Sequence, residues 1–234
     1  MRKIIALILG FVLATGLVSF SQECEAEWYE QYDWDAIGYS WEMAPWLTTV
    51  DEFKSIIYDN ITHDVPKESI SEGSGSIDEF DENGFLLNYE IFRYPYLSLR
   101  YDDNYTIYGK PAVYIRAEFV PDTGTGSYTT DYCGDYKLIE VTIGFDPDAS
   151  MGTQYLYNTL ANRISFKLGS PDTDKSGYGG YTIESSKWCL FYNAPVPIVT
   201  LSAHYLSDAD DSVLLTYSYN NKRLLKEVSE LTLK

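Results

Sequence analysis

Basic residues are scarce in this sequence, which holds 17 lysines and arginines against 35 aspartates and glutamates and carries a formal net charge of −18. Proteins bind nucleic acids and anionic lipid surfaces through basic faces. We therefore expect no nucleic-acid partner. The 234 residues, 45% of them hydrophobic, are enough to bury a core, as one large domain or two small ones.

Histidine and cysteine are also rare. The two histidines are His63 and His204, and the three cysteines form no CxxC pair, so a zinc site has almost no ligands. The sequence lacks a GxSxG elbow, a P-loop and a GxGxxG turn after a strand. A nucleophilic site would have to use one of the two histidines, and we interpret His204 as an exposed strand residue. The sequence therefore favours a non-catalytic protein over an enzyme.

The N-terminus has the composition of a secretory signal peptide. Arg2 and Lys3 precede an apolar run over residues 4–18, which is shorter than a membrane span requires. We predict a signal peptide at residues 1–21 and an exported chain, periplasmic or extracellular, without a membrane span. Acylation of Cys24 is the alternative, but the acid before this cysteine does not fit a lipobox, so lipoprotein anchoring is disfavoured.

An exported chain with three cysteines forms at most one disulfide within a monomer. Cys133 comes just before a predicted strand at 136–145, and Cys189 follows Trp188 in another predicted strand. If a bridge forms, we predict that it joins Cys133 to Cys189.

The segment after the signal peptide, residues 22–46, is an acidic aromatic arm. Residues 22–53 hold nine acids, no base and four of the five tryptophans. In one interpretation Trp41 and Trp46 pack on the first helix and the rest of the arm frays. In the other, the arm orders on a basic, grooved partner. The residues expected to bind in that case are Trp28, Tyr32 and Trp34.

Two helices are predicted. Thr49 and Glu52 form a capping box at the start of a helix over residues 49–61. A second apolar stripe runs from Leu156 to Leu168 with helical spacing and is ended by a glycine and a proline.

Strands are predicted around these helices. Residues 73–76, Gly-Ser-Gly-Ser, are interpreted as a flexible connector, and residues 81–84, Asp-Glu-Asn-Gly, as a hairpin turn between two strands. Alternation of apolar and polar residues predicts further strands. They lie at 113–119, 139–145, 178–184, 187–193, 197–206 and 212–220.

The predicted fold is therefore α+β, with two consecutive units at residues 47–148 and 149–234. Each unit is expected to be a helix packed on a curved antiparallel sheet, which buries the apolar stripes of both elements.

The second unit resembles a group of small periplasmic helix-plus-sheet proteins. The resemblance rests on residues 167–171 (KLGSP), 188–192 (WCLFY) and 213–217 (VLLTY). They are similar to the helix end, LGxP turn and WxxxY strand of a group that includes the small lipoprotein of the outer-membrane barrel-assembly machinery and the beta-lactamase inhibitory protein. Because members of this group mostly bind other proteins, the resemblance implies a protein partner.

One segment has the spacing of a calcium loop. Asp172, Asp174 and Ser176 occupy positions 1, 3 and 5, and Gly177 occupies position 6. Position 12 is Ile183, where such a loop has an acid. Calcium is thus the one cofactor considered, and a polar, glycine-rich loop is the alternative.

Two functions remain at this stage. The first is an exported, non-catalytic protein that binds another macromolecule, most simply a protein. The alternative is a carbohydrate-binding module or glycan-processing protein. It would use surface tyrosines such as Tyr94 and Tyr96, since aromatic rings stack on sugars, together with a carboxylate pair.

Overall fold

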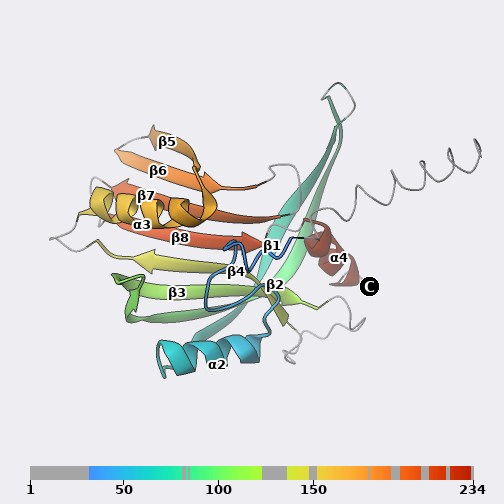
Figure 1. Cartoon of the computed structure of the whole chain (residues 1–234). Coiled ribbons are helices and arrows are strands. Elements are labelled where there is room, and N and C mark those ends of the chain that lie inside the picture. The colour runs from blue at the N-terminus through green and yellow to red at the C-terminus, as the bar shows by residue number, and fades with distance from the viewer. Residues whose placement is uncertain are drawn as a thin grey trace, which may run out of the picture. The chain divides into compact units, whose positions relative to one another are not determined.

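The computed structural model describes residues 32–80, 83, 85–122, 136–147, 152–178, 180–190, 196–206, 211–219 and 222–232. Residues from Trp34 onward belong to one compact unit, and the residues before it belong to another. The fold is α+β, as predicted, and is mostly sheet (Figure 1). The elements are α2 (Val50–Asn60), β1 (Lys67–Phe80), β2 (Leu86–Ile107), β3 (Lys110–Pro121), β4 (Tyr136–Phe145), α3 (Thr153–Leu168), β5 (Asp172–Tyr178), β6 (Tyr181–Trp188), β7 (Pro197–Leu206), β8 (Ser212–Tyr219) and α4 (Lys222–Thr232).

All eight strands form one antiparallel sheet with the order β1-β2-β3-β4-β8-β7-β6-β5. Each run of four strands is a meander. The two meanders join where β4 pairs with β8, from Glu140 opposite Ser218 to Phe145 opposite Val213. The sheet is therefore continuous from β1 to β5.

Cross-strand pairing shows which residues share a face, because successive residues of a strand point to opposite sides. We call the side that carries α2 and α3 the helix face. One row of paired, buried residues crosses it: Leu99, Ala117, Val141, Tyr217, Val199 and Trp188. We call the other side the open face.

The helix α2 begins at the predicted capping box. The Glu52 amide donates to the Thr49 hydroxyl, and the Thr49 amide donates to the Glu52 carboxylate at 2.8 Å. Phe53 is buried on the helix face, with its ring 5.5 Å from that of Phe119, and Trp41 packs on Phe53 as predicted. The first helix and its contact with Trp41 are confirmed, whereas Trp46 lies against Tyr219 of β8, with ring centroids 5.6 Å apart.

The helix α3 also follows the prediction. Its buried residues include Leu156, Leu160 and Ile164, and it ends at Gly169, whose φ of 85° suits glycine. The indole nitrogen of Trp188 donates to the Gly169 carbonyl at 3.0 Å. The tryptophan therefore fills the core and also satisfies a carbonyl at the helix end.

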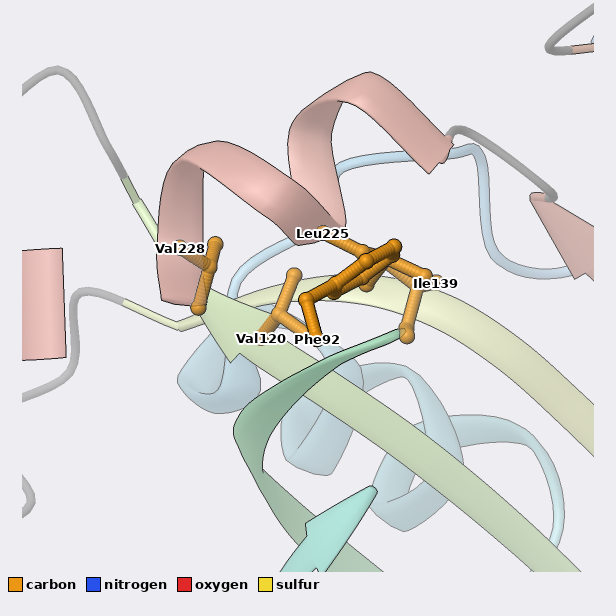
Figure 2. Packing of buried hydrophobic residues seen from close by; sticks show 5 residues of the cluster. All are labelled: Phe92, Val120, Ile139, Leu225 and Val228. Atoms are coloured by element: carbon orange, nitrogen blue, oxygen red, sulfur yellow. The ribbon is translucent and has the colours of Figure 1, made fainter. Parts of the chain in front are cut away.

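The C-terminal helix α4 was not predicted. It lies on the open face, at the base of the β1–β2 hairpin, and Lys226 pairs with Glu90 at 2.6 Å. Figure 2 shows its apolar side against the sheet. The buried residues of this cluster are Phe92, Val120, Ile139, Leu225 and Val228.

The connector prediction at residues 73–76 is wrong, because these residues lie within β1. Glycines are accommodated there by rings on the neighbouring strand. A Cβ on Gly73 would lie 2.7 Å from Cζ of Tyr94, and one on Gly75 would lie 2.5 Å from Cζ of Phe92. Aromatic side chains thus cover the glycines of an edge strand, which are half-buried.

Two predicted strands are misplaced. The meander in the second half of the chain begins with β5 at Asp172–Tyr178 and β6 at Tyr181–Trp188. The sequence predicted these two strands at 178–184 and 187–193. Residues 191–193 of the second of these predicted strands, and most of the predicted turn at 81–84, lie outside the described residues. The strands β1 and β2 flank that turn as predicted.

Candidate functional site

The open face is polar over most of its area. One row of paired residues crosses all eight strands there. It consists of Lys67, Arg100, Arg116, Thr142, Thr216, Thr200, Lys187 and Asp172. This side of the sheet has no α2 or α3 against it, but its central strands are only partly exposed: Thr142 is buried, and Thr200 and Thr216 are half-buried.

An aromatic ring lies across the centre of this face. Tyr114 is paired with Gly144, and a Cβ on that glycine would lie 2.1 Å from Cε1 of the ring. The guanidinium of Arg100 lies 4.1 Å from the ring centroid on Tyr114. The tyrosine is therefore held between the sheet and an arginine, an arrangement stabilised by a cation–π contact.

Two carboxylates oppose each other farther along β3, four residues from Tyr114. Glu118 on β3 is paired with Glu140 on β4, and Arg116 lies between them, 3.5 Å from an oxygen of Glu118 and 3.3 Å from one of Glu140. The Thr142 hydroxyl donates to the same Glu140 oxygen at 3.2 Å. Burial, and then the Glu140 charge, raise the pKa of Glu118 to about 7, against the opposing effect of Arg116.

The β1–β2 hairpin continues beyond β3, so residues 86–96 pair with β1 alone among the strands (Figure 1). Leu87, Tyr89 and Ile91 lie on one side of this two-stranded ribbon and are 68%, 56% and 63% exposed. We call these three residues the apolar stripe. Phe85 precedes them and is 72% exposed.

The ribbon that carries the apolar stripe is acidic. Between residues 68 and 92 the sequence has seven acids and no base. The nearest bases are Lys67 and Arg93, at the two ends of this segment. An apolar surface bordered by acids is complementary to an apolar cleft with a basic rim.

His204 has partners on both ring nitrogens. The Tyr181 hydroxyl lies 2.6 Å from Nδ1 and the Ser202 hydroxyl 3.1 Å from Nε2. The imidazole is half-buried rather than exposed as predicted, and burial lowers its pKa. The strand β7 is paired on both sides, so the backbone amides around Ser202 serve the sheet and are not available to stabilise an oxyanion. The three groups are arranged as a structural hydrogen-bond chain.

The predicted arm residues are placed as follows. Trp28 lies outside the described residues, and Tyr32 is 40% exposed in the N-terminal unit. Trp34 is buried, with its ring edge-on to Tyr39 at 5.8 Å. An anchoring role for Trp34 would therefore require the ring to leave this position, while binding by the arm stays a prediction.

The calcium-loop residues do not form a loop. Asp172, Asp174 and Ser176 lie at alternate positions of β5, an edge strand, so their side chains project from one side of an extended backbone. No group of three metal-ligating side chains converges within the described parts of the chain. Calcium binding stays a prediction, without the loop that suggested it.

The predicted disulfide also stays a prediction, because Cys133 lies outside the described residues. Cys189 follows β6 and is half-buried, with no disulfide partner in the part of the chain that the structure describes.

Comparison of the chain with protein families, with curated proteins and with solved structures found no match. Within the described ranges, the three helices are too short or too polar to cross a lipid bilayer.

Proposed function

We propose that this chain is an exported, non-catalytic protein that binds another protein through the β1–β2 hairpin. The apolar stripe carries the proposal, since three large side chains more than half exposed on one side of a ribbon are typical of an interaction site. Full burial of such a side chain contributes about 1.5–3 kcal/mol. The signal-like composition of residues 1–21 supports export.

The acidic ribbon defines the chemistry of this partner. Its seven acids favour encounter with a basic surface, and the stripe then enters an apolar cleft within that surface. Anionic lipid is disfavoured as the target because the same acids would be repelled by it.

The test compares two double variants as bait. Leu87→Ser/Ile91→Ser removes the apolar stripe, while Val65→Ser/Tyr58→Ser removes side chains that are 91% and 55% exposed elsewhere. Wild type and the control are expected to capture the same protein from an envelope extract and culture medium of the producing cells, and the stripe variant is expected to lose it. Equal capture by both variants would contradict the role of the stripe.

Carbohydrate binding is the second candidate, favoured by two rings on the open face. Tyr94 and Tyr96 are half-buried there, with ring centroids 6.5 Å apart. Tyr114 is less suited, because Arg100 lies on its ring. Binding on a glycan array that Tyr96→Ala abolishes, without any captured protein, would favour this alternative; a blank array would dismiss it.

We also propose that the sheet consists of two units. The chain runs from α2 through four strands and then from α3 through four strands, and β4 and β8 form the seam. This order supports the tandem arrangement expected from the sequence. Expression of residues 149–234 alone, followed by a thermal unfolding measurement, tests it: a cooperative transition is expected.

A further inference from the structure

A pocket of about 520 Å³ lies on the helix face, away from the open face. It is bounded by α3, by residues 35–42 and by the turn between β2 and β3. Small-molecule sites in proteins have volumes of roughly 300–1,000 Å³. The pocket therefore has the size of a site for a small ligand.

The floor of the pocket offers a hydroxyl donor. The hydroxyls of Tyr108 and Tyr217 lie 3.0 Å apart, so one donates to the other. The second proton has no acceptor among the described residues, although Tyr217 is buried. Burial raises the pKa of Tyr217 to about 12 and that of Tyr108 further, so both hydroxyls keep their protons at neutral pH.

Tyr108 holds a strained backbone position to reach this place. It is the first residue of a two-residue hairpin turn and has a φ of 55°, where glycine or asparagine is usual. Such a conformation is strained for a residue with a bulky side chain, and strained residues cluster at functional sites. The contacts that hold it are the hydroxyl pair and the Arg163 guanidinium, 4.4 Å from the ring centroid.

Two bases on α3 converge at one carboxylate beside this floor. Arg163 and Lys167 are one helical turn apart, and Glu42 lies 3.8 Å from the first and 3.1 Å from the second. The Glu42 side chain is 45% exposed. Its position shows that a carboxylate fits between the two bases, and its exposure leaves it free to exchange with another.

The rim of the pocket is apolar. Phe166 on α3 is 92% exposed and Ile37 on the opposite wall is 40% exposed, and both line the pocket. When an apolar group of a ligand covers such an exposed phenylalanine, the free energy of the complex falls, because apolar surface is removed from water.

We propose that this pocket binds a small hydrophobic carboxylate. The ligand's carboxylate replaces that of Glu42 on Arg163 and Lys167 and accepts the remaining hydroxyl proton of the tyrosine pair. Its apolar body lies against Phe166 and Ile37. This site does not depend on the hairpin and would act in addition to the binding of a protein.

Calorimetric titration of the mature chain with octanoate and with 2-naphthoate tests the site. The neutral analogues 1-octanol and 2-naphthalenemethanol serve as ligand controls. At least one carboxylate is expected to bind tenfold more tightly than its neutral analogue. If octanoate binds more tightly than 2-naphthoate, the pocket favours a flexible apolar group, and the reverse order indicates a planar one. Two results would overturn the proposal. One is that neither carboxylate binds at a concentration of about 1 mM, which is the range of weak ligands. The other is that the neutral analogues bind as tightly as the carboxylates.

Variants then locate the bound carboxylate. Arg163→Met and Lys167→Met are expected to weaken binding about tenfold, whereas Glu42→Gln is expected to tighten it, because it removes the competing carboxylate. Lys175→Met is the matched control, since this 64% exposed lysine pairs with Glu184 on the β5–β6 hairpin, outside the pocket. Lys167 is 50% exposed, so its loss leaves the core intact. Weaker binding by Glu42→Gln, or unchanged binding by Lys167→Met, contradicts the proposed exchange.

Discussion

The contact between Tyr114 and Gly144 makes a sharp prediction about stability. In Gly144→Ala the new Cβ would lie 2.1 Å from Cε1 of Tyr114, so the ring must move away from the strand. Overpacking of this kind costs about 1–3 kcal/mol, and the displaced ring also loses about 0.5–1 kcal/mol of cation–π attraction to Arg100. Alanine loses less backbone conformational entropy than glycine when the strand folds, which offsets this cost by roughly 0.5–1 kcal/mol.

We therefore expect Gly144→Ala to destabilise the chain by about 2 kcal/mol, which corresponds to a fall in Tm of roughly 4–8 °C. Urea denaturation measures the free energy of unfolding, and the decisive comparison is the same substitution in a Tyr114→Ala background. Without the ring the destabilisation should disappear, and Gly144→Ala should be neutral or stabilising. If the substitution costs as much in both backgrounds, the ring is not the obstacle and the reasoning is refuted.

Two further predictions concern the open face. Glu118→Gln should stabilise the chain at pH 8 and do so progressively less as the pH falls to 4.5. The reason is that burial raises the pKa of Glu118 to about 7, so the folded state keeps a proton that the unfolded state releases. Denaturation curves across this pH range test this, with the exposed Glu72→Gln as control, and a stability difference that does not change with pH would contradict it. Leu225→Ala should cost about 2 kcal/mol and speed amide exchange within α4 before the rest of the sheet, whereas the exposed Lys222→Ala should do neither.

The elements that sequence analysis predicted well are those with local signals. The reciprocal hydrogen bonds of Thr49 and Glu52 depend on residues three apart, and the stripe of α3 depends on helical spacing. The strands β3, β7 and β8 alternate between buried and more exposed residues over most of their length, so their period was readable without the partner strand. The strand β4 was also predicted from alternating residue types, but it is buried on both sides from Val141 to Phe145. The helix α4 also has a local signal, since Leu225 and Val228 lie three residues apart, although no helix was predicted there.

The features that were missed depend on register. Residues 73–76 look like a linker until Tyr94 and Phe92 are placed opposite their glycines, which only the β1–β2 pairing reveals. Glu118 and Glu140 become neighbours through the irregular pairing of β3 with β4. The acids of β5 suggested a calcium loop because oxygen-bearing side chains at every second residue occur both in calcium loops and in polar edge strands.

The candidate site was predicted only in part for the same reason. The arm, whose acidic and aromatic composition suggested a binding role, buries Trp34 and Trp41 in the chain's own structure. The apolar stripe was not predicted as a site because the alternation of Leu87, Tyr89 and Ile91 is typical of a strand with one buried side. Only the structure shows that this side of the ribbon is exposed.

The most direct test of a protein-binding hairpin is the dissociation constant of the captured partner, measured by calorimetry for two double variants beside wild type. Leu87→Ser/Ile91→Ser should weaken binding by about 10- to 100-fold, since each buried aliphatic side chain contributes about 1.5–3 kcal/mol and part of this is retained. Val65→Ser/Tyr58→Ser should bind as wild type does. A stripe variant that is folded and binds with an unchanged dissociation constant would contradict the account.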